Sequence, residues 1–414
     1  MFDSQKYGYF PILQKPSSKL MFVTFVVSIG LAIFNTVYSL FLENLINNPS
    51  QVGLITALLT LVVFFSYVFL TQLFSKYPTK KVWIYCTLLT VAILVLLFFF
   101  NNIYWFIVLC CLYFMATTVQ WENTAVLLRG TTSLENIQRT EEHFYGFNNI
   151  GWMVGPFIAS IVIFNLNIKY NFLIAGAAFF ISYLFFLIFK IDSYKHDIEF
   201  KTAYTKQLDL TDVFFNIKTY FLNKENIRLF VLRGGLYIYW SVIYIFMPLL
   251  ILESGLSTYM IGVFLGSVMI PLILFELFIN KRFVNLNIKS FFIIGYSIIA
   301  LCSILAFVFS YNMRLSLFFM ILTGIGAAFI EPTTEAYFFK LTRSVDVPLY
   351  YGIYKTSESV FNIIARLSLS VLLVYFTLNY VYLFLAIFML IILFITFGIE
   401  NIKTGQTIFG HFNF

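Results

Sequence analysis

The feature that most constrains this chain is a series of twelve apolar runs, each long enough to cross a lipid bilayer. A spanning helix needs about 20 mostly apolar residues. Of the 414 residues, 61% are hydrophobic and only 11% are charged, whereas an average soluble domain has about 25% charged residues. This composition excludes a water-soluble enzyme and predicts an all-α polytopic membrane protein. The runs cover roughly residues 20–42, 51–74, 82–100, 103–127, 144–164, 170–190, 228–251, 257–279, 289–310, 314–339, 349–376 and 379–399.

The basic residues predict how the chain is oriented, because loops rich in Lys and Arg stay in the cytoplasm. With the N-terminus inside, 21 Lys and Arg residues fall in inner segments, and the outer loops hold only Lys169 and Arg314. We therefore expect both termini in the cytoplasm and a multi-pass protein, monomeric, in the cell membrane. The formal net charge of +7 reflects these inner segments, and we expect no nucleic-acid partner.

A charged stretch divides the twelve runs into two sets of six. It predicts an N-terminal half at 1–190, a cytoplasmic central loop at 191–226 and a C-terminal half at 227–414. Within the loop, apolar residues at positions 210, 213, 214, 217 and 221 have the spacing of an amphipathic helix on the inner membrane surface.

The two halves also repeat one another in sequence. Gly53 at the start of the second run corresponds to Gly262 in the eighth, a shift of 209 residues, and the same shift relates Glu122 to Glu331. Because six spans per half is an even number, the two repeats enter the membrane the same way. Parallel repeats of this kind in secondary transporters place the substrate site between the halves, near mid-membrane.

Three local sequences resemble the signatures of a known family. After the second run, Leu73 and the basic residues Lys76, Lys80 and Lys81 resemble the pattern G-x-L-x-D-R-x-G-R-R, and Gly151-x-x-x-Gly155-Pro156 in the fifth run matches G-x-x-x-G-P. Arg139 and Gly146 precede the fifth run in a pattern like R-x-x-x-x-G, with extra residues.

Over nearly its whole length the chain thus resembles the major facilitator superfamily (MFS) of transporters. The resemblance implies two six-helix halves and a gating contact at Lys76, Lys80 and Lys81. The family's Gly and Asp positions are Thr71 and Ser75 here, which departs from its Asp-based contact.

The signature in the fifth run resembles one that is enriched in antiporters. Gly151 and Gly155 remove side chains one turn apart so that another helix can approach, and Pro156 bends the span. Gly262 and Gly266 give the eighth run a matching small face, and the family packs these two spans together. The alternative is a packing face that has no bearing on the direction of transport.

Several charged residues lie inside the spans, where facing lipid would cost about 2.5–3.5 kcal/mol each. Lys355, Glu358, Asn362 and Arg366 share one stripe of a helix, and Lys355 can pair with Glu358. Such a pair either latches helices together or breaks during alternating access. Two further carboxylates join this predicted ion-pair and gating group near the inner ends of the tenth and eighth runs: Glu335, either solvated or paired with Lys340, and Glu276.

Glu122 and Glu331 are the strongest candidates for a transport site, because they are related by the repeat and fall in spans that line the family's cavity. A buried, unpaired carboxylate can load and release a proton near neutral pH, or can hold a cation. The alternative is that each pairs with Lys355 or Arg366. Polar and aromatic side chains expected to contribute to proton or substrate binding are Gln120, Asn123, Asn35, Tyr38, Asn148, Asn149, Trp240 and Tyr244.

No motif in the chain supports an enzyme, a metal site or a cofactor, and we expect no catalytic residues. The sequence therefore favours a secondary active transporter of a small organic solute. Proton-coupled export of a cationic or amphipathic solute, by antiport, is the preferred form. Alternatives are uptake of an anionic or sugar-like solute through Lys355 and Arg366, or a non-transporting receptor of the same fold.

Overall fold

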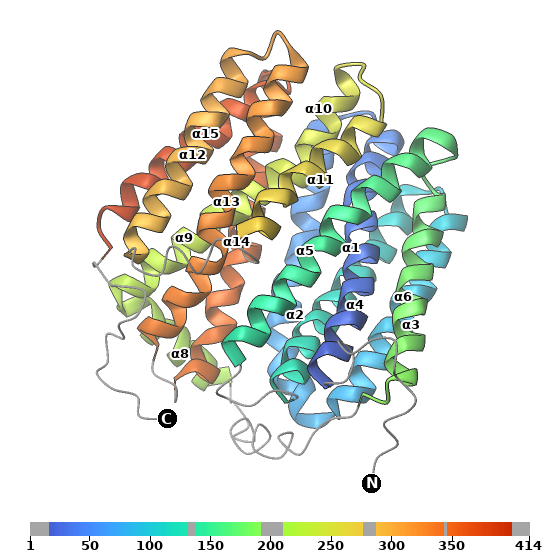
Figure 1. Cartoon of the computed structure of the whole chain (residues 1–414), viewed down its shortest axis with the longest axis vertical. Coiled ribbons are helices and arrows are strands. Elements are labelled where there is room, and N and C mark those ends of the chain that lie inside the picture. The colour runs from blue at the N-terminus through green and yellow to red at the C-terminus, as the bar shows by residue number, and fades with distance from the viewer. Residues whose placement is uncertain (1–15, 131–136, 192–209, 276–286, 343–345, 400–414) are drawn as a thin grey trace.

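The computed structural model describes residues 16–130, 137–191, 210–275, 287–342 and 346–399. These residues form long helices that run between the two ends of the molecule (Figure 1). The helices are α1 (Pro16–Ile46), α2 (Pro49–Lys76), α3 (Thr79–Phe99), α4 (Ile103–Gly130), α5 (Ile137–Asn165), α6 (Tyr170–Ile188), α8 (Leu210–Leu222), α9 (Lys224–Ser241), the π-helix η3 (Val242–Phe246), α10 (Met247–Glu253), α11 (Tyr259–Leu274), α12 (Ile288–Val308), α13 (Met313–Leu341), α14 (Val347–Tyr375) and α15 (Tyr380–Thr396).

The number of apolar helices confirms the twelve-span prediction. Ten segments are long and apolar enough to cross a membrane, with α9, η3 and α10 counted as one, and α11 and α15 are shorter apolar helices. The fifth apolar span, Phe144–Asn165, agrees with the predicted run at 144–164, and its helix α5 extends further toward the inner end, to Ile137. The polar segment before the apolar run is helical too, so Gly146 lies inside a helix and not in a loop.

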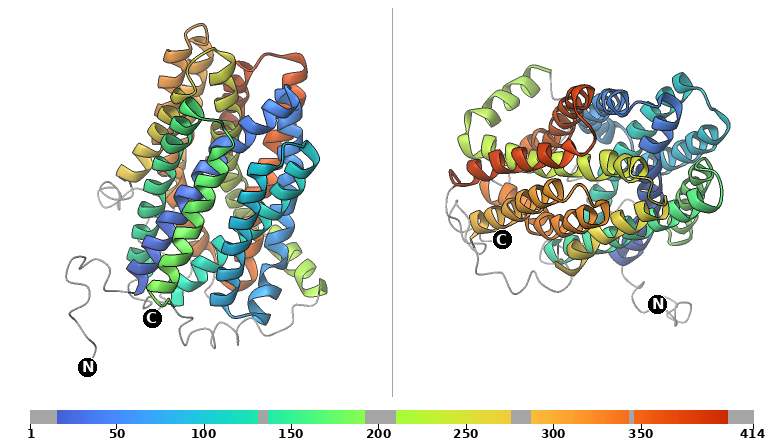
Figure 2. Two further views of the ribbon diagram at one scale, coloured as in Figure 1. Left: turned by 90° about the vertical axis from the view of Figure 1, so that its right-hand side faces the viewer. Right: turned by 90° about the horizontal axis from the view of Figure 1, so that it is seen from above.

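The two halves of the chain lie side by side (Figures 1 and 2). In the first half α1 packs on α5, and α3 packs on α4 and α6. In the second half the corresponding helices pair in the same way: α9 packs on α14, and α12 packs on α13 and α15. This shared arrangement confirms the two parallel six-helix repeats. The halves join chiefly through α2 against α14 and α5 against α11.

One end of the bundle carries the connections that the sequence predicts to be extracellular, and we call it the outer end. There the chain turns between α1 and α2, α3 and α4, α5 and α6, α10 and α11, α12 and α13, and α14 and α15. At the first of these turns, the side chain of Asn48 accepts a hydrogen bond from the backbone N–H of Gln51, and Pro49 occupies the first helical position. Both features favour a helix start, and they fix where α2 begins.

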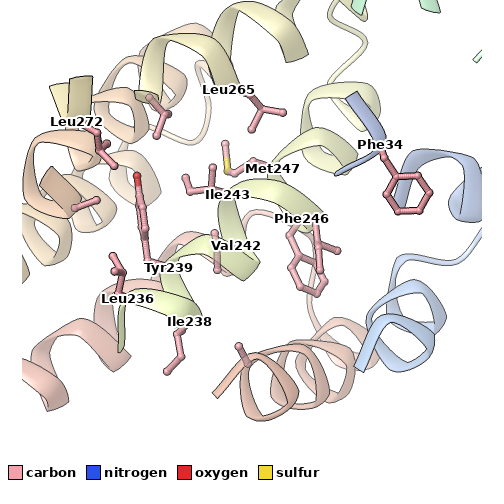
Figure 3. Packing of buried hydrophobic residues seen from close by; sticks show 14 of the residues in the cluster. Phe34, Leu236, Ile238, Tyr239, Val242, Ile243, Phe246, Met247, Leu265 and Leu272 are labelled. Atoms are coloured by element: carbon pink, nitrogen blue, oxygen red, sulfur yellow. The ribbon is translucent and has the colours of Figure 1, made fainter. Parts of the chain in front are cut away.

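The seventh span is interrupted by η3, and a proline explains why. Pro248 has no N–H to donate to the carbonyl of Tyr244. The preceding residue, Met247, donates its N–H to the carbonyl of Val242, which lies five residues earlier and not four as in an α-helix. The widened turn lies in the buried core, where Tyr239, Ile243 and Met247 are fully enclosed near Leu265 and Leu272 of α11 (Figure 3). The turn therefore presents its side chains at positions that a regular helix would not reach.

The amphipathic spacing in the central loop corresponds to a helix, α8, at Leu210–Leu222. Tyr220 is buried against Tyr350 of α14, with ring centroids 5.6 Å apart, whereas Phe215 and Leu222 are exposed. Exposed apolar side chains suit a helix that meets lipid head groups, and the placement of α8 at the inner membrane surface stays a prediction.

Candidate functional site

A cluster of four charged side chains lies inside the C-terminal half, between α9, α13 and α14. Arg233 Nη1 is 2.7 Å from Glu335 Oε1, and Lys355 Nζ is 2.8 Å from the same oxygen. Arg233 Nη2 is 3.7 Å from Glu358 Oε2. Two cations and two carboxylates therefore balance one another, and this four-residue network is neutral as a unit.

Two tyrosines also contact Arg233, whose side chain is only 4% exposed and whose Nε has no hydrogen-bond partner among the described residues. Its guanidinium donates to the hydroxyls of Tyr354 at 3.0 Å and Tyr237 at 2.9 Å. The centre of the guanidinium also lies 4.6 Å and 5.0 Å from the centroids of those two rings. A cation this deeply buried needs such partners, because its hydration is lost.

The network corrects two predictions about pairing. Lys355 pairs with Glu335 on the neighbouring helix and not with Glu358 on its own, and Glu335 is neither simply solvated nor paired with Lys340. The reason is geometric: α13 brings Glu335 between two cations, a better position than a single helical i,i+3 neighbour provides. Arg233 was not predicted to take part, although a base inside an apolar run is the signal that could have found it.

Glu122 and Glu331 stand apart from this network. Among the described residues neither forms an ion pair, and Glu331 Oε2 is buried without a hydrogen-bond partner. Both carboxyls nevertheless lie within electrostatic reach of Arg233 and Lys355. The alternative in which Lys355 or Arg366 neutralises them by direct pairing is therefore wrong for the described part of the chain.

Arg366 reaches across to the other half of the molecule. Its Nη1 donates to the backbone oxygen of Thr56 at 2.9 Å and to the hydroxyl of Thr60, both on α2. Its Nε lies 3.4 Å from Ser241 Oγ, which in turn donates to Asn362 Oδ1 at 2.5 Å. Arg366 thus ties α14 to α2 with neutral partners, and this contact lies toward the outer end.

Most of the polar side chains predicted near the carboxylates make hydrogen bonds between or within helices. Gln120 donates to Thr87 Oγ1 and Asn123 donates to the backbone oxygen of Thr79, each at 2.6 Å, which ties α4 to α3. The further contacts are Ser28 donating to Asn148 Oδ1, and Asn35 donating to the backbone oxygen of Leu31. Asn149 is buried and has a partner of its own. Their part in substrate binding stays a prediction.

Several aromatic side chains lie together on and beside the seventh span. Tyr244, on η3, lies within electrostatic reach of Glu331, as does Tyr239. The Trp240 ring centroid is 5.7 Å from that of Tyr244, and the Trp152 centroid on α5 is 5.4 Å from it. The predicted candidate Tyr38 lies elsewhere, buried and stacked on Phe34 with centroids 5.5 Å apart.

The predicted small faces lie where helices approach closely. A Cβ atom at Gly151 would lie 2.7 Å from the Cβ of Ser28, so α1 is the partner of this glycine, and Gly155 likewise faces Ala32. A Cβ atom at Gly262 would lie 2.6 Å from the carbonyl oxygen of Pro156, and Gly266 faces the ring of Phe157. The face at Gly262 and Gly266 therefore packs α11 on α5, between the halves.

The predicted gating residues at the inner end are only partly covered. Glu276 and the side chain of Lys76 lie outside the described residues. Lys81 is exposed and Lys80 is half-buried with a partner. A gating role for these four residues stays a prediction.

The family model described as Major Facilitator Superfamily matches residues 20–283 and 229–407. The chain belongs to this superfamily. As a member of the MFS, it is an integral multi-pass membrane protein and a secondary transporter. A search of curated proteins finds no match.

Solved structures share this MFS fold at low sequence identity. A POT family transporter in complex with a thioalcohol-conjugated peptide is 13% identical with a TM-score of 0.78, and the match covers 92% of this chain and 95% of that one. The nucleoside transporter NupG is 15% identical with a TM-score of 0.71, over 92% of this chain and 98% of that one. At such identities the likeness establishes the fold alone.

Proposed function

We propose that this transporter exports a cationic or amphipathic organic solute in exchange for protons, with Glu122 and Glu331 as the carboxylates that both ligands use. The observation that carries the proposal is the carboxyl of Glu331, which has no hydrogen-bond or ion-pair partner among the described residues and lies within electrostatic reach of a neutral ion network. A carboxylate without a counter-ion in a desolvated position gains from binding either a proton or a cation. Proton and solute then compete, and competition of this kind couples their movements.

The repeat supports giving Glu122 the same role. It occupies the equivalent position on α4, and the described residues include no ion-pair partner for it. The Gly151-x-x-x-Gly155-Pro156 segment, which resembles an antiporter signature, supports the direction. We further propose that the protein lies in the cell membrane with both termini in the cytoplasm, which agrees with the distribution of basic residues.

Uptake of an anionic or sugar-like solute through Lys355 and Arg366 is less favoured. Lys355 is held by Glu335 at 2.8 Å, and Arg366 is held by α2. An incoming anion would have to displace these partners before either cation could bind it. Saturable inward flux of an anion that is lost in Lys355→Ala would favour this alternative.

Proteoliposomes containing the purified protein and a pH-sensitive dye test the proposal. A panel of organic cations added to one side should move protons to that side in wild type, and Glu122→Gln combined with Glu331→Gln should abolish this coupled flux. The matched control is Glu253→Gln, because Glu253 is an exposed carboxylate at the outer end. Undiminished proton-coupled flux in the double variant would rule out the proposed role of these carboxylates.

A further inference from the structure

The helix α8 is attached to the C-terminal half by one of its faces. The ring of Tyr220 is fully buried, and its centroid lies 5.6 Å from that of Tyr350 on α14. The next residue, Phe221, packs edge-on against Phe230 of α9 at 5.1 Å, and Phe230 lies 6.0 Å from Phe361 of α14. Aromatic contacts with two spans therefore hold α8 against this half.

Hydrogen bonds fix the corner between α8 and α9. The carbonyl oxygen of Tyr220 accepts from the backbone N–H of Asn223 at 3.3 Å and from Asn226 Nδ2 at 3.2 Å. The side chain of Asn223 accepts from the backbone N–H of Glu225 at 2.9 Å and caps the start of α9. The direction of α8 is therefore fixed relative to the seventh span, which begins at Lys224.

The opposite face of α8 is open. Phe215 is 68% exposed and Leu222 is 72% exposed, and Lys218 between them is exposed as well. At 100° per residue these three side chains share one stripe of the helix, about 140–160° around from Tyr220. Because Tyr220 is buried against the C-terminal half, the stripe of Phe215, Lys218 and Leu222 points away from that half.

The position of α8 brings this stripe next to lipid. The helix lies at the inner end of the bundle and at its edge (Figure 2). On the other side of the corner, Ile227 in the first turn of the seventh span is also exposed, so exposed apolar side chains continue from Leu222 onto a span. Large apolar side chains at such a boundary are favoured by insertion among the lipid head groups and acyl chains.

The charges indicate which lipids suit the stripe. Lys218 and Lys224 are exposed, and neither forms an ion pair within the described part of the chain. Glu225 is already paired with Arg228, and Asp212 lies in the first turn of α8, where the helix dipole favours a carboxylate. A Lys close to a membrane surface that contains anionic lipid favours the bound state roughly fivefold.

We propose that Phe215, Lys218 and Leu222 form a surface that binds anionic lipid in the inner leaflet. The two apolar side chains enter the leaflet, and the ammonium groups of Lys218 and Lys224 contact the lipid phosphates. Because α8 is fixed to α9 and α14, lipid bound here stabilises the folded C-terminal half. The surface is independent of the solute that the protein carries.

Thermal unfolding of the full-length protein in nanodiscs tests the surface. Discs of phosphatidylcholine are compared with discs that also contain phosphatidylglycerol. The anionic lipid should raise the Tm of wild type by about 2–4 °C, and Lys218→Gln with Lys224→Gln should lose most of this rise. Lys190→Gln is the matched control, because Lys190 is an exposed lysine at the inner end of the other half. An equal Tm of wild type in the two lipids, or a full rise in the double variant, would overturn the proposal.

A fluorescent label tests the contact with lipid directly. In a background with Cys86 and Cys111 replaced by serine, Leu222→Cys carrying an NBD group is exposed to aqueous acrylamide. Quenching should be about twofold weaker in the discs with phosphatidylglycerol, and Lys218→Gln should remove the difference. The control label is at Tyr311→Cys, an exposed position in the outer turn between α12 and α13, where quenching should be equal in both lipids. Equal quenching at position 222 would contradict the proposed contact.

Substitutions of Tyr220 test whether bound lipid acts on the C-terminal half. Tyr220→Ala removes the buried ring and should abolish the rise in Tm that phosphatidylglycerol causes. Tyr220→Phe should keep the rise, because Tyr220 Oη has no hydrogen-bond partner among the described residues. A full rise in folded Tyr220→Ala would refute the action of lipid on this half through α8.

Discussion

At the scale of single residues, Arg233 links several charged and polar side chains inside the C-terminal half. One guanidinium contacts two carboxylates and two tyrosine hydroxyls on three helices. Buried ion pairs of this kind gain little in net stability over apolar packing, but breaking one leaves a buried charge uncompensated. The residue therefore matters chiefly through what its removal would expose.

Replacing Arg233 by Met should lower the free energy of unfolding by about 3–5 kcal/mol, because Glu335 and Glu358 would lose their shared cation. The comparison is Arg228→Met, which breaks the partly exposed pair with Glu225 and should cost no more than about 1 kcal/mol. Unfolding in detergent micelles measures both variants. An equal decrease in the free energy of unfolding in both variants would show that the buried network contributes no more to stability than the partly exposed pair.

The residues of this network mark the limit of prediction from sequence. Helical spacing correctly placed Lys355, Glu358 and Arg366 on one stripe, since that spacing depends only on the local chain. It could not supply the partner of Lys355, because Glu335 is 20 residues away along the chain and reaches Lys355 only through the packing of α13 on α14. Arg233 is a further 102 residues from Glu335.

At the scale of helices, close approach depends on the absence of a few side chains. Gly262 on α11 meets the backbone of α5, where the carbonyl oxygen of Pro156 lies 2.6 Å from the position of an added Cβ atom. Gly53 is its repeat equivalent on α2, and an added Cβ atom there would lie 3.2 Å from the carbonyl oxygen of Arg366. The same device is therefore used at both contacts between the halves.

Gly262→Ala should destabilise the protein by about 1–3 kcal/mol and slow transport, because a backbone carbonyl cannot move aside as a side chain can. Gly352→Ala is the matched control on α14, since no atom lies within 4 Å of its added Cβ. The control should be neutral or stabilising by up to about 1 kcal/mol, as Ala favours helix over Gly. Thermal unfolding and solute flux measure both, and a harmless Gly262→Ala would contradict the close packing.

Helix geometry was only partly predictable from the sequence. The apolar runs gave the spans, and the small-residue positions indicated where helices approach. The π-helix was not predicted, although Pro248 is visible in the seventh run. A proline in a helix predicts that one backbone hydrogen bond is lost. Whether the helix then kinks, ends or forms a wider turn depends on packing neighbours such as Leu265 and Leu272, whose positions the sequence alone does not give.

At the scale of the whole molecule, the halves are held together near the outer end. Ser50 Oγ on α2 donates to the backbone oxygen of Ser370 on α14 at 2.7 Å, close to the contacts of Arg366 with Thr56 and Thr60. On the other side of the molecule, Gly262 of α11 meets Pro156 and Ser160 of α5. The structure thus represents a state in which these two crossings are closed.

A cross-link between α2 and α14 should hold that state. In a background with Cys86 and Cys111 replaced by serine, Ser50→Cys with Ser370→Cys should form a disulfide under mild oxidation and stop transport, with recovery on reduction. Ser50→Cys with Ser310→Cys is the control, because Ser310 follows α12, which packs on α13 and α15. Full transport by the oxidised Ser50–Ser370 pair would mean that this crossing does not open.

The overall architecture was the most predictable level. The number of spans and the parallel repeat follow from hydropathy and internal similarity, and each of these uses many residues. Single departures from the family signature, such as Thr71 and Ser75, therefore did not change the prediction of the fold. The helix contacts between the halves were harder to predict from the sequence, because the Ser50–Ser370 contact joins residues 320 positions apart. Such contacts arise only when both repeats are folded and docked.

The hydrogen bonds from Arg366 to α2 constrain how this sequence can change during evolution. One of its two acceptors is the main-chain oxygen of residue 56, and every amino acid supplies that oxygen. Position 56 can therefore be substituted by other residues that fit the space without loss of the hydrogen bond from Arg366. Thr60 contributes its hydroxyl, so far fewer residues can replace it. Among relatives of this chain, a preserved arginine facing a variable position 56 and a hydroxyl-bearing position 60 is the pattern this arrangement would leave.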